Sequence, residues 1–417
     1  MLSLKLLYNS PLATLLTGWK KKKKGVVVRA LDDPDLEKDP LRAEYVKSIP
    51  EAQLYRGVLL QRYLIPTDLL EGLDDMSIRK DDVFIITYPK SGTTWTEEIV
   101  SLIYKGGDVS KVEKELLFNR VHHLEVGRPI GHLRFLQKLR SPRLMATHLP
   151  LPLLPRQLQR KPKCKIIYVM RNPKDTAVSF YHHHKMSNFL GNSTATWDQF
   201  FAYFVSGNVV YGSWFDHVLP YWEFCKHYPN NVFFIAYEEL KLDLKGMVHR
   251  LCEFLEQSLE DEVIDAIVEH CTFERMKTNN MVNREVVPIP DLFDMSKSKF
   301  MRKGIIGDWK NYFTKEQSEA FNQMCHSRMS DSDLPLVFEP EEAAELLINE
   351  GRIIFNHPQR STDVNNENII QSDDEDHDEE IELHYSQYEP RYPDRSSWLP
   401  SVHLHVLPDP LTLDAVG

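Results

Sequence analysis

Hydrophobic and polar residues alternate with two different periods along the middle of the chain. Short, apolar, β-branched runs occur at residues 82–88 (DVFIITY), 165–170 (KIIYVM) and 232–237 (VFFIAY), a pattern typical of strands buried on both faces. Residues 95–104 (WTEEIVSLIY) and 244–255 (LKGMVHRLCEFL) instead place apolar side chains three and four positions apart, which predicts amphipathic helices. The alternation predicts an α/β fold in which one domain has a central parallel sheet flanked by helices.

The segment TYPKSGTTW, residues 87–95, follows the first predicted strand, and ligands of such sheets bind where strands end. Pro89 and Gly92 are expected to form a turn, and the two threonines that follow to begin a helix, so that backbone N–H groups gather at a positive helix terminus. This P-loop-like segment suits an anion, and Lys90 adds a charge that can stabilise a leaving phosphate oxygen. It lacks the G-x-x-x-x-G-K-[ST] pattern of nucleoside triphosphatases, and a simple helix-capping turn is the alternative.

Two further segments indicate a second phosphate. In RNPKDTAVSFYHHH, residues 171–184, Arg171 ends a predicted strand and Asn-Pro can begin a helix that carries Ser179. Arginine offers a fork of donors to phosphate. In FMRKGIIGDWK, residues 300–310, a basic pair lies beside a glycine; alone it would be a solvated turn. Together the three segments predict a ligand with two separated phosphates.

Four stretches resemble, in order and spacing, the signatures of the cytosolic sulfotransferases: TYPKSGTTW, SPRLMATHLP, RNPKDTAVSFYHH and RKGIIGDWKNYF. The likeness covers most of residues 41–338, and the ordered set is much more specific than any one motif. It implies 3′-phosphoadenosine 5′-phosphosulfate as the donor, no metal, and a small-molecule hydroxyl or amine as the acceptor. The loop at 87–95 would hold the phosphosulfate end.

The resemblance also implies roles for single residues. Lys90 would stabilise the leaving oxygen, His148 would take the acceptor's proton as general base, and Ser179 would belong to both the catalytic and the 3′-phosphate sets. Trp95 would stack on the adenine, with a place in the core as its alternative. The residues expected to bind the donor are Lys90, Ser91, Gly92, Thr93, Thr94, Trp95, Arg171, Ser179, Tyr237, Phe273, Phe300, Met301, Arg302, Lys303 and Gly304.

The expected acceptor pocket departs from the family pattern. Ala146 stands where K-T-H-L-P has a lysine that would position the acceptor oxygen, so weaker transfer or an altered acceptor is expected. His123 and His183 stand where phenol-accepting members have phenylalanines. With His148 they are expected to surround a polar or acidic hydroxyl compound, because imidazoles donate hydrogen bonds and phenyl rings do not. Zinc binding by these histidines, or unrelated surface positions, are the alternatives.

Two other classes of function compete with an active sulfotransferase. A non-catalytic nucleotide-binding module would keep the donor site and lose turnover; Ala146 favours it, whereas Lys90 and His148 argue against it. A P-loop kinase or nucleoside triphosphatase lacks both the G-K-[ST] end and a clear metal-binding aspartate.

Composition narrows the partners and the compartment. The 417 residues carry a formal net charge of −11, which argues against general binding to nucleic acid, and no apolar run has the length of a membrane span. The five scattered cysteines indicate reduced thiols and a cytoplasmic protein.

The segment KNYFTKEQSE, residues 310–319, resembles the family's dimerisation motif but has Lys315 in place of valine, so at most a weak homodimer is expected.

Both ends differ in composition from the middle. Residues 1–40 include the run Lys20 to Lys24 and are interpreted as a disordered extension, in preference to a targeting segment or a membrane-surface patch. Residues 339–417 contain the acidic block SDDEDHDEEIE and are expected to be a disordered tail, since dense like charges repel and bury little. The predicted sulfotransferase domain is 41–338.

Overall fold

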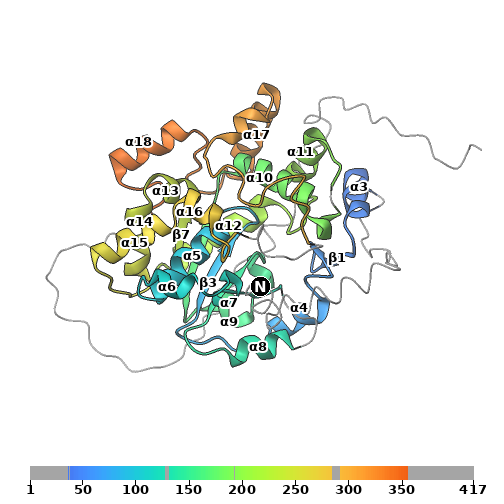
Figure 1. Cartoon of the computed structure of the whole chain (residues 1–417). Coiled ribbons are helices and arrows are strands. Elements are labelled where there is room, and N and C mark those ends of the chain that lie inside the picture. Colours follow the sequence, from blue (N-terminus) through green and yellow to red (C-terminus); the bar gives the residue numbers. More distant parts are fainter. Residues whose placement is uncertain (1–35, 37, 127–130, 192, 284–291, 356–417) are drawn as a thin grey trace, which may run out of the picture. The chain divides into compact units, whose positions relative to one another are not determined.

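The protein contains a five-stranded parallel sheet (Figure 1). The computed structural model describes residues 36, 38–126, 131–191, 193–283 and 292–355. The strand order is β4-β5-β3-β6-β7, with every pairing parallel. The strands are β3 (Val83–Thr87), β4 (His122–His123), β5 (Leu144–Thr147), β6 (Lys165–Met170) and β7 (Val232–Ala236). The predicted α/β class with a central parallel sheet is therefore confirmed.

The three apolar runs correspond to the central strand and its two neighbours on one side. Every residue of β3 and β7 is buried, which is why these strands read as continuous apolar runs. The other two strands were not predicted: β4 is a two-residue edge strand of histidines, and β5 has only four residues. A separate antiparallel pair, β1 (Ala52–Tyr55) and β2 (Val58–Gln61), precedes the parallel sheet.

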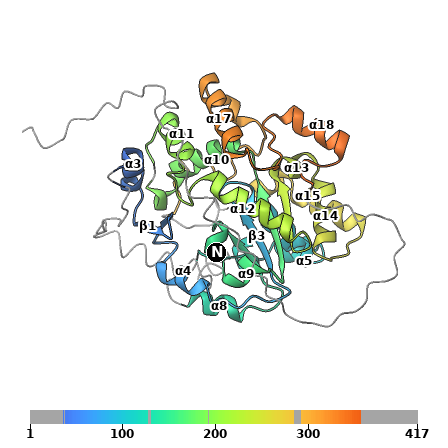
Figure 2. The ribbon, with the colours of Figure 1, turned by 180° about the vertical axis from the view of Figure 1, so that it is seen from behind.

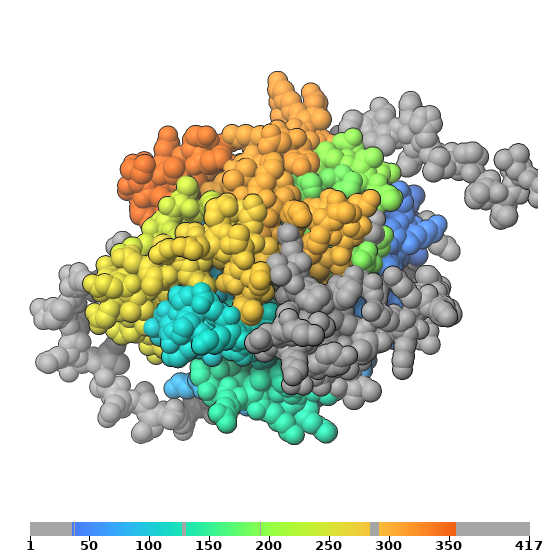
Figure 3. All heavy atoms as spheres, in the orientation of Figure 1, coloured from blue at the N-terminus to red at the C-terminus, as the bar shows by residue number. Residues whose placement is uncertain are grey.

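Helices cover both faces of the sheet. On one face α5 (Thr93–Tyr104), α14 (Leu244–Phe254) and α15 (Asp261–His270) share a buried cluster with alternate strand residues such as Ile85 and Ile167. Figure 3 shows α15 (yellow) beside α6 (Val109–Val112, cyan) at this face. On the other face, seen from behind in Figure 2, α12 (Trp214–His227) packs so that the Tyr221 ring stacks 4.6 Å from that of Tyr168.

No helix among the described residues has the length and apolar character needed to cross a membrane. The remaining helices surround the layers described above. They are α3 (Pro40–Ser48), α4 (Thr67–Leu73), α7 (Leu117–Arg120), α8 (His132–Lys138), α9 (Arg156–Arg160), α10 (Pro173–Met186), α11 (Trp197–Val205), α13 (Tyr237–Leu242), α16 (Phe273–Thr278), α17 (Lys315–Arg328) and α18 (Pro340–Glu350), with 3-10 turns η1 (Leu151–Leu153), η2 (Asn188–Leu190) and η3 (Asp308–Asn311).

The expected start of the C-terminal tail is wrong. Residues 340–350 form α18, which packs against α13, and Ile353 and Ile354 beyond it are buried. The helix has Pro340 at its start, two acids in its first turn and Gly351 in the left-handed conformation at its end, which are ordinary helix boundary signals. The acidic block at 372–382 and the extension at 1–35 lie outside the described residues.

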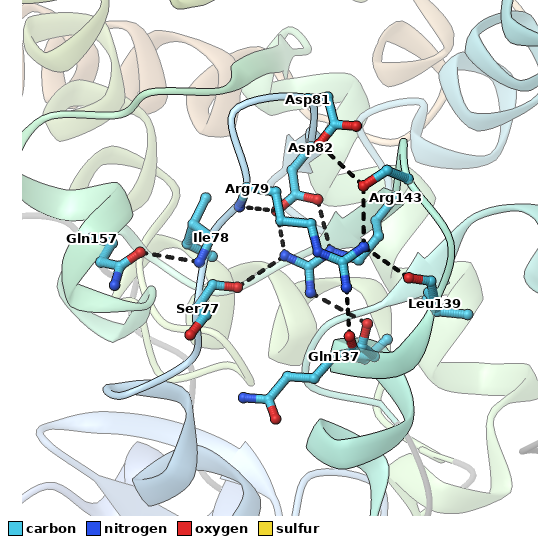
Figure 4. Close-up of polar contacts among 11 residues, drawn as sticks. Ser77, Ile78, Arg79, Asp81, Asp82, Gln137, Leu139, Arg143 and Gln157 are labelled. Carbon is cyan, nitrogen blue, oxygen red and sulfur yellow. Dashed lines mark hydrogen bonds and ion pairs between the residues drawn. The ribbon is translucent and has the colours of Figure 1, made fainter.

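A buried ion pair ties together the amino ends of two strands (Figure 4). Asp82 immediately precedes β3 and Arg143 immediately precedes β5; the Arg143 guanidinium donates to both carboxylate oxygens, with Nε 2.7 Å from Oδ1. The same guanidinium donates to the carbonyl oxygens of Leu136 and Ser77. Removing one partner would leave the other charge buried without compensation, which is strongly destabilising. The pair therefore fixes the register of the two strands whose opposite ends carry the candidate site.

Candidate functional site

A cavity of about 310 Å³ lies where the strands end. Lys90 follows β3, His148 follows β5, Arg171 follows β6 and Tyr237 follows β7, and all four line this cavity. Carboxyl ends of parallel strands lie at one edge of a sheet, so residues far apart in sequence meet there. The other predicted residues that line the same cavity are Gly92, Thr93, Thr94, Trp95, His123, Ser179, His183, Phe273, Phe300, Met301, Arg302, Lys303 and Gly304.

The loop between β3 and α5 has the conformation expected of an anion-binding turn. Gly92 has φ 110°, and a Cβ atom there would lie 2.9 Å from the Tyr237 ring, so both the backbone and the close approach require glycine. Helix α5 begins at Thr93, as predicted. The Thr93 hydroxyl lies 2.7 Å from that of Thr87. The N–H groups of the first helical turn therefore face the ligand end of the sheet, where helix dipole and donors favour an anion.

Two polar side chains of this loop differ in exposure. Ser91 is fully buried and does not line the cavity, and its Oγ has no hydrogen-bond partner among the described residues. Lys90 lines the cavity with its Nζ 4.8 Å from the centre of the Phe300 ring, and its φ is 73°. Positive φ is strained for a lysine. The loop thus directs one ammonium group to the cavity.

Arg171 connects the loop to the basic segment near residue 303. Its guanidinium stacks 4.4 Å from the centre of the Tyr237 ring and donates to the carbonyl oxygens of Lys90 and Ile305. Its Nε is buried and has no hydrogen-bond partner among the described residues. A stacked guanidinium with unused donors is well suited to phosphate. Ser179 lies on α10, which Asn172 caps, and lines the same cavity.

Asp308 holds the basic pair of the third segment. Its carboxylate accepts from Lys303 Nζ at 2.5 Å and also from Arg302. Burial alone would raise the pKa of Asp308, but the hydrogen bonds from Lys303 and Arg302 outweigh burial and the pKa is lowered. The carboxylate is therefore ionised near neutral pH and keeps both cations at the cavity. Gly304, with φ 63°, lies so close to the Phe273 ring that a Cβ atom would be 2.2 Å from it.

Trp95 serves the core and the cavity together. Its indole N–H donates to the Cys271 carbonyl oxygen at 2.8 Å, and its ring lies edge-on, 5.6 Å from the Tyr237 ring. The same side chain packs against the core cluster around α5. The two roles predicted for Trp95, a place in the core and a place beside the adenine, are therefore compatible. One edge of the ring is fixed by the core while the residue lines the cavity.

His148 is fixed by hydrogen bonds to its ring and to its backbone. Ring Nδ1 lies 2.9 Å from the Thr87 carbonyl oxygen, which can only accept, and 3.1 Å from the Thr87 hydroxyl, which can accept as well. This geometry favours a neutral ring with its proton on Nδ1 and its lone pair on Nε2. The backbone N–H donates to Glu125 Oε1 at 2.8 Å, and the backbone carbonyl accepts from His217 Nε2 at 2.9 Å. This tautomer is the one that a general base needs at Nε2.

The other predicted acceptor-side residues lie at different places. The His123 ring is 5.7 Å from that of His148, whereas His183 packs between Phe189 and Phe293. Ala146 does not line the cavity: its side chain is buried in the core cluster on the α5 face of the sheet, which corrects its expected place. Among the described residues, no group of three histidine, cysteine or carboxylate side chains could hold a metal ion.

Several cavity residues were not predicted. Tyr63, His122, His132 and Tyr211 all line it, and they come from segments without a recognisable motif. Burial lowers the pKa of His122 to about 4, and burial also lowers the pKa of His132, so both rings are neutral near pH 7. The adjacent histidine pair 122–123 was a usable signal, whereas nothing in the sequence distinguishes Tyr211.

The chain is similar to known proteins across the domain that contains this cavity. A family model described as "Sulfotransferase domain" matches residues 80–333. Sulfotransferase 1A1 from Canis lupus familiaris is 43% identical over 306 residues, covering 73% of this chain and 97% of that protein. Sulfotransferase 1B1 from Mus musculus is 42% identical over 276 residues, covering 66% and 91%.

Solved structures show the same likeness. A mouse sulfotransferase, SULT7A1, complexed with PAP has a TM-score of 0.57 and 33% identity, covering 70% of this chain and 98% of that one. Retinol dehydratase in complex with androsterone and inactive cofactor PAP has a TM-score of 0.62 and 27% identity, covering 72% and 96%.

Proposed function

Since this chain belongs to the sulfotransferase family, we propose that it moves a sulfuryl group from 3′-phosphoadenosine 5′-phosphosulfate to a small-molecule hydroxyl or amine. One observation carries the proposal: Lys90, in a loop built for an anion, and His148, with its lone pair on Nε2, line the same cavity. The relatives solved with PAP support a donor of this kind.

The donor has two phosphate positions, and separate residues are assigned to them. The N–H groups at the start of α5, with Lys90, would hold the 5′ end, where the helix terminus attracts negative charge. Arg171, Ser179 and the Arg302–Lys303 pair would hold the 3′-phosphate, since they line the cavity as a group of cations and one hydroxyl. Trp95 and Phe273 would flank the adenine.

The chemical step needs a base and a stabilised leaving group. The acceptor oxygen forms a bond to sulfur while the bond from sulfur to the phosphate oxygen breaks. Nε2 of His148 takes the proton of the acceptor hydroxyl, and Lys90 balances the charge that grows on the leaving phosphate oxygen. Most of the remaining acceleration comes from holding both reactants in line. Ser179 would steady the donor between its two phosphates.

A weak homodimer and a cytoplasmic location complete the proposal. Within the segment that resembles the dimerisation motif, Thr314 caps α17 and Lys310 pairs with Glu339 of the same chain, while the Lys315 side chain is 83% exposed. An exposed lysine in place of an apolar residue weakens a small interface. All five cysteines are buried thiols, which supports a reducing compartment.

Calorimetric titration with adenosine 3′,5′-bisphosphate and with adenosine 5′-monophosphate tests the donor site. We expect the bisphosphate to bind at least roughly tenfold more tightly, a difference of about 1.4 kcal/mol. Equal affinity, or no binding of either nucleotide, would contradict the assigned 3′-phosphate site. A protein that binds the bisphosphate and transfers nothing would instead be the non-catalytic module.

A further inference from the structure

A close contact between an imidazole and a carboxylate lies in the wall of the cavity next to the proposed base. Nε2 of His123 is 3.0 Å from Oε1 of Glu97, and the two side chains are 12% and 2% exposed. His123 lines the cavity, whereas Glu97 lies behind it on α5 and does not. A carboxylate placed behind an imidazole holds the ring in one orientation and favours a proton on the nitrogen that faces the carboxylate.

The position of this pair is related to the missing lysine. In the parallel pairing of β4 with β5, His123 is the register partner of Ala146. Partners in a parallel pair place their side chains on the same face, here the face toward α5. A lysine at 146 would therefore extend toward the space that His123 and Glu97 take up. The short alanine side chain leaves room for His123 and Glu97, and the imidazole supplies a polar group in the region where a lysine was expected.

His123 has a nitrogen available for a ligand. Nε2 faces Glu97 in an orientation that forms no hydrogen bond, and the other ring nitrogen, Nδ1, is buried and also has no hydrogen-bond partner among the described residues. The backbone carbonyl of His123 accepts from His132 Nε2 at 2.9 Å, which fixes the strand that carries the ring. The rings of His123 and His148 are 5.7 Å apart. Two imidazoles this close can contact two neighbouring polar groups of one small molecule.

We infer that Glu97 and His123 select an acceptor with two adjacent hydroxyl groups, one beside His148 and the other bonded to His123 Nδ1. This inference rests on the proposed sulfotransferase function. A hydroxyl both donates and accepts, so it pairs with His123 whether the ring is neutral or protonated. A compound with a single hydroxyl leaves Nδ1 buried and unpaired, which disfavours it.

The charges of the cavity disfavour the other polar classes. No carboxylate belongs to the described residues that line the cavity, and its charged side chains are the cations Lys90, Arg171, Lys241, Arg302 and Lys303. A cationic amine at the second position would face these cations without a paired anion. A carboxylate at the second position would lie close to the buried carboxylate of Glu97, and the two anions would compete for the imidazole of His123. A second hydroxyl, which is neutral, avoids both conflicts.

The test compares three acceptors with the same ring: catechol (two adjacent hydroxyls), phenol (one) and 2-hydroxybenzoate (hydroxyl beside a carboxylate). With the wild-type chain we expect kcat/KM for catechol to exceed that for either other compound by roughly tenfold or more, since sites that bond a substrate hydroxyl reject analogues without it. The variant His123→Phe should lose this preference, mainly through a raised KM for catechol. Glu97→Gln should reduce the preference, and His123→Gln, which keeps a donor and an acceptor, should retain part of it.

Controls separate this inference from the function on which it rests. His249→Phe makes the same change on the exposed side of α14 and should leave the preference unchanged; bisphosphate affinity should match wild type in all variants. If His123→Phe does not fold, Glu97→Gln carries the test. The inference alone would be overturned if kcat/KM for phenol or 2-hydroxybenzoate equalled that for catechol. It would also be overturned if the ratio of kcat/KM for catechol to that for phenol were the same in every variant. Bisphosphate binding without sulfation of any of the three would overturn both claims.

Discussion

Nδ1 of His148 lies 2.9 Å from the carbonyl oxygen of Thr87, the last residue of β3. The same strand end leads directly into the loop that carries Lys90. The proposed base, which follows β5, therefore contacts the end of the strand that carries the cation for the leaving group, and the carbonyl favours the tautomer that the base needs. Sites built on strand ends hold reacting groups more accurately than sites on long loops.

Substituting His217 tests whether the backbone of His148 must be held. His217 Nε2 donates to the His148 carbonyl oxygen, and its Nδ1 accepts from the Tyr168 hydroxyl at 2.8 Å. His217→Phe removes both bonds, and we expect kcat to fall by roughly tenfold or more, as small misplacements of a catalytic group do. His217→Gln, which can still donate, should recover part of kcat. Equal kcat in wild type and both variants, measured with saturating donor, would contradict this positioning role.

Substituting Lys90 tests the charge at the leaving oxygen. Lys90→Met keeps the length of the side chain and removes the charge, and we expect kcat to fall by about 10² to 10³, the usual effect of losing one transition-state stabiliser. The affinity for adenosine 3′,5′-bisphosphate should fall much less, because backbone N–H groups of α5 remain. A loss of affinity as large as the loss of kcat would show that Lys90 acts in ground-state binding.

Substituting Arg171 tests the second phosphate. Arg171→Met should weaken binding of adenosine 3′,5′-bisphosphate by roughly tenfold or more and leave adenosine 5′-monophosphate nearly unaffected, since a charged hydrogen bond contributes about 1.5 to 3 kcal/mol. Arg156→Met, at a side chain that is 65% exposed, is the matched control. Calorimetry that finds both nucleotides weakened equally would place Arg171 elsewhere than at the 3′-phosphate.

Buried histidines should make the free energy of unfolding decrease as the pH falls. Burial lowers the pKa of His217 to about 3 and that of His184 to about 4, below the unfolded value of 6.5. The unfolded chain therefore binds more protons between these values, so stability is full above about pH 6.5 and is lost as the pH falls toward 4. We expect the free energy of unfolding by urea to drop by about 2 kcal/mol per such histidine between pH 7 and 5. In His184→Gln the slope should be shallower, and an identical slope would contradict the assignment.

The fold and the donor loop could be predicted because their signals are local. The apolar runs of β3, β6 and β7 and the glycine of the loop each occupy one short segment. Pairing of β4 with β5 depends on tertiary contacts, which a two-residue strand of histidines does not reveal. The side-chain direction of Ala146 could not be predicted either, because it follows from strand register. In the sequence Glu97 is one polar residue of a predicted helix, and only the structure shows that it contacts His123 beside the cavity.

The most direct test of the central claim is transfer of labelled sulfate from 3′-phosphoadenosine 5′-phosphosulfate to catechol by wild type and His148→Ala. The exposed His249→Ala is the matched control. We predict steady transfer by wild type and the control, and a fall of about 10² to 10⁴ in kcat for His148→Ala with bisphosphate affinity unchanged. Equal rates for wild type and His148→Ala would contradict the account, because the cavity would then transfer sulfate without the base that its geometry assigns.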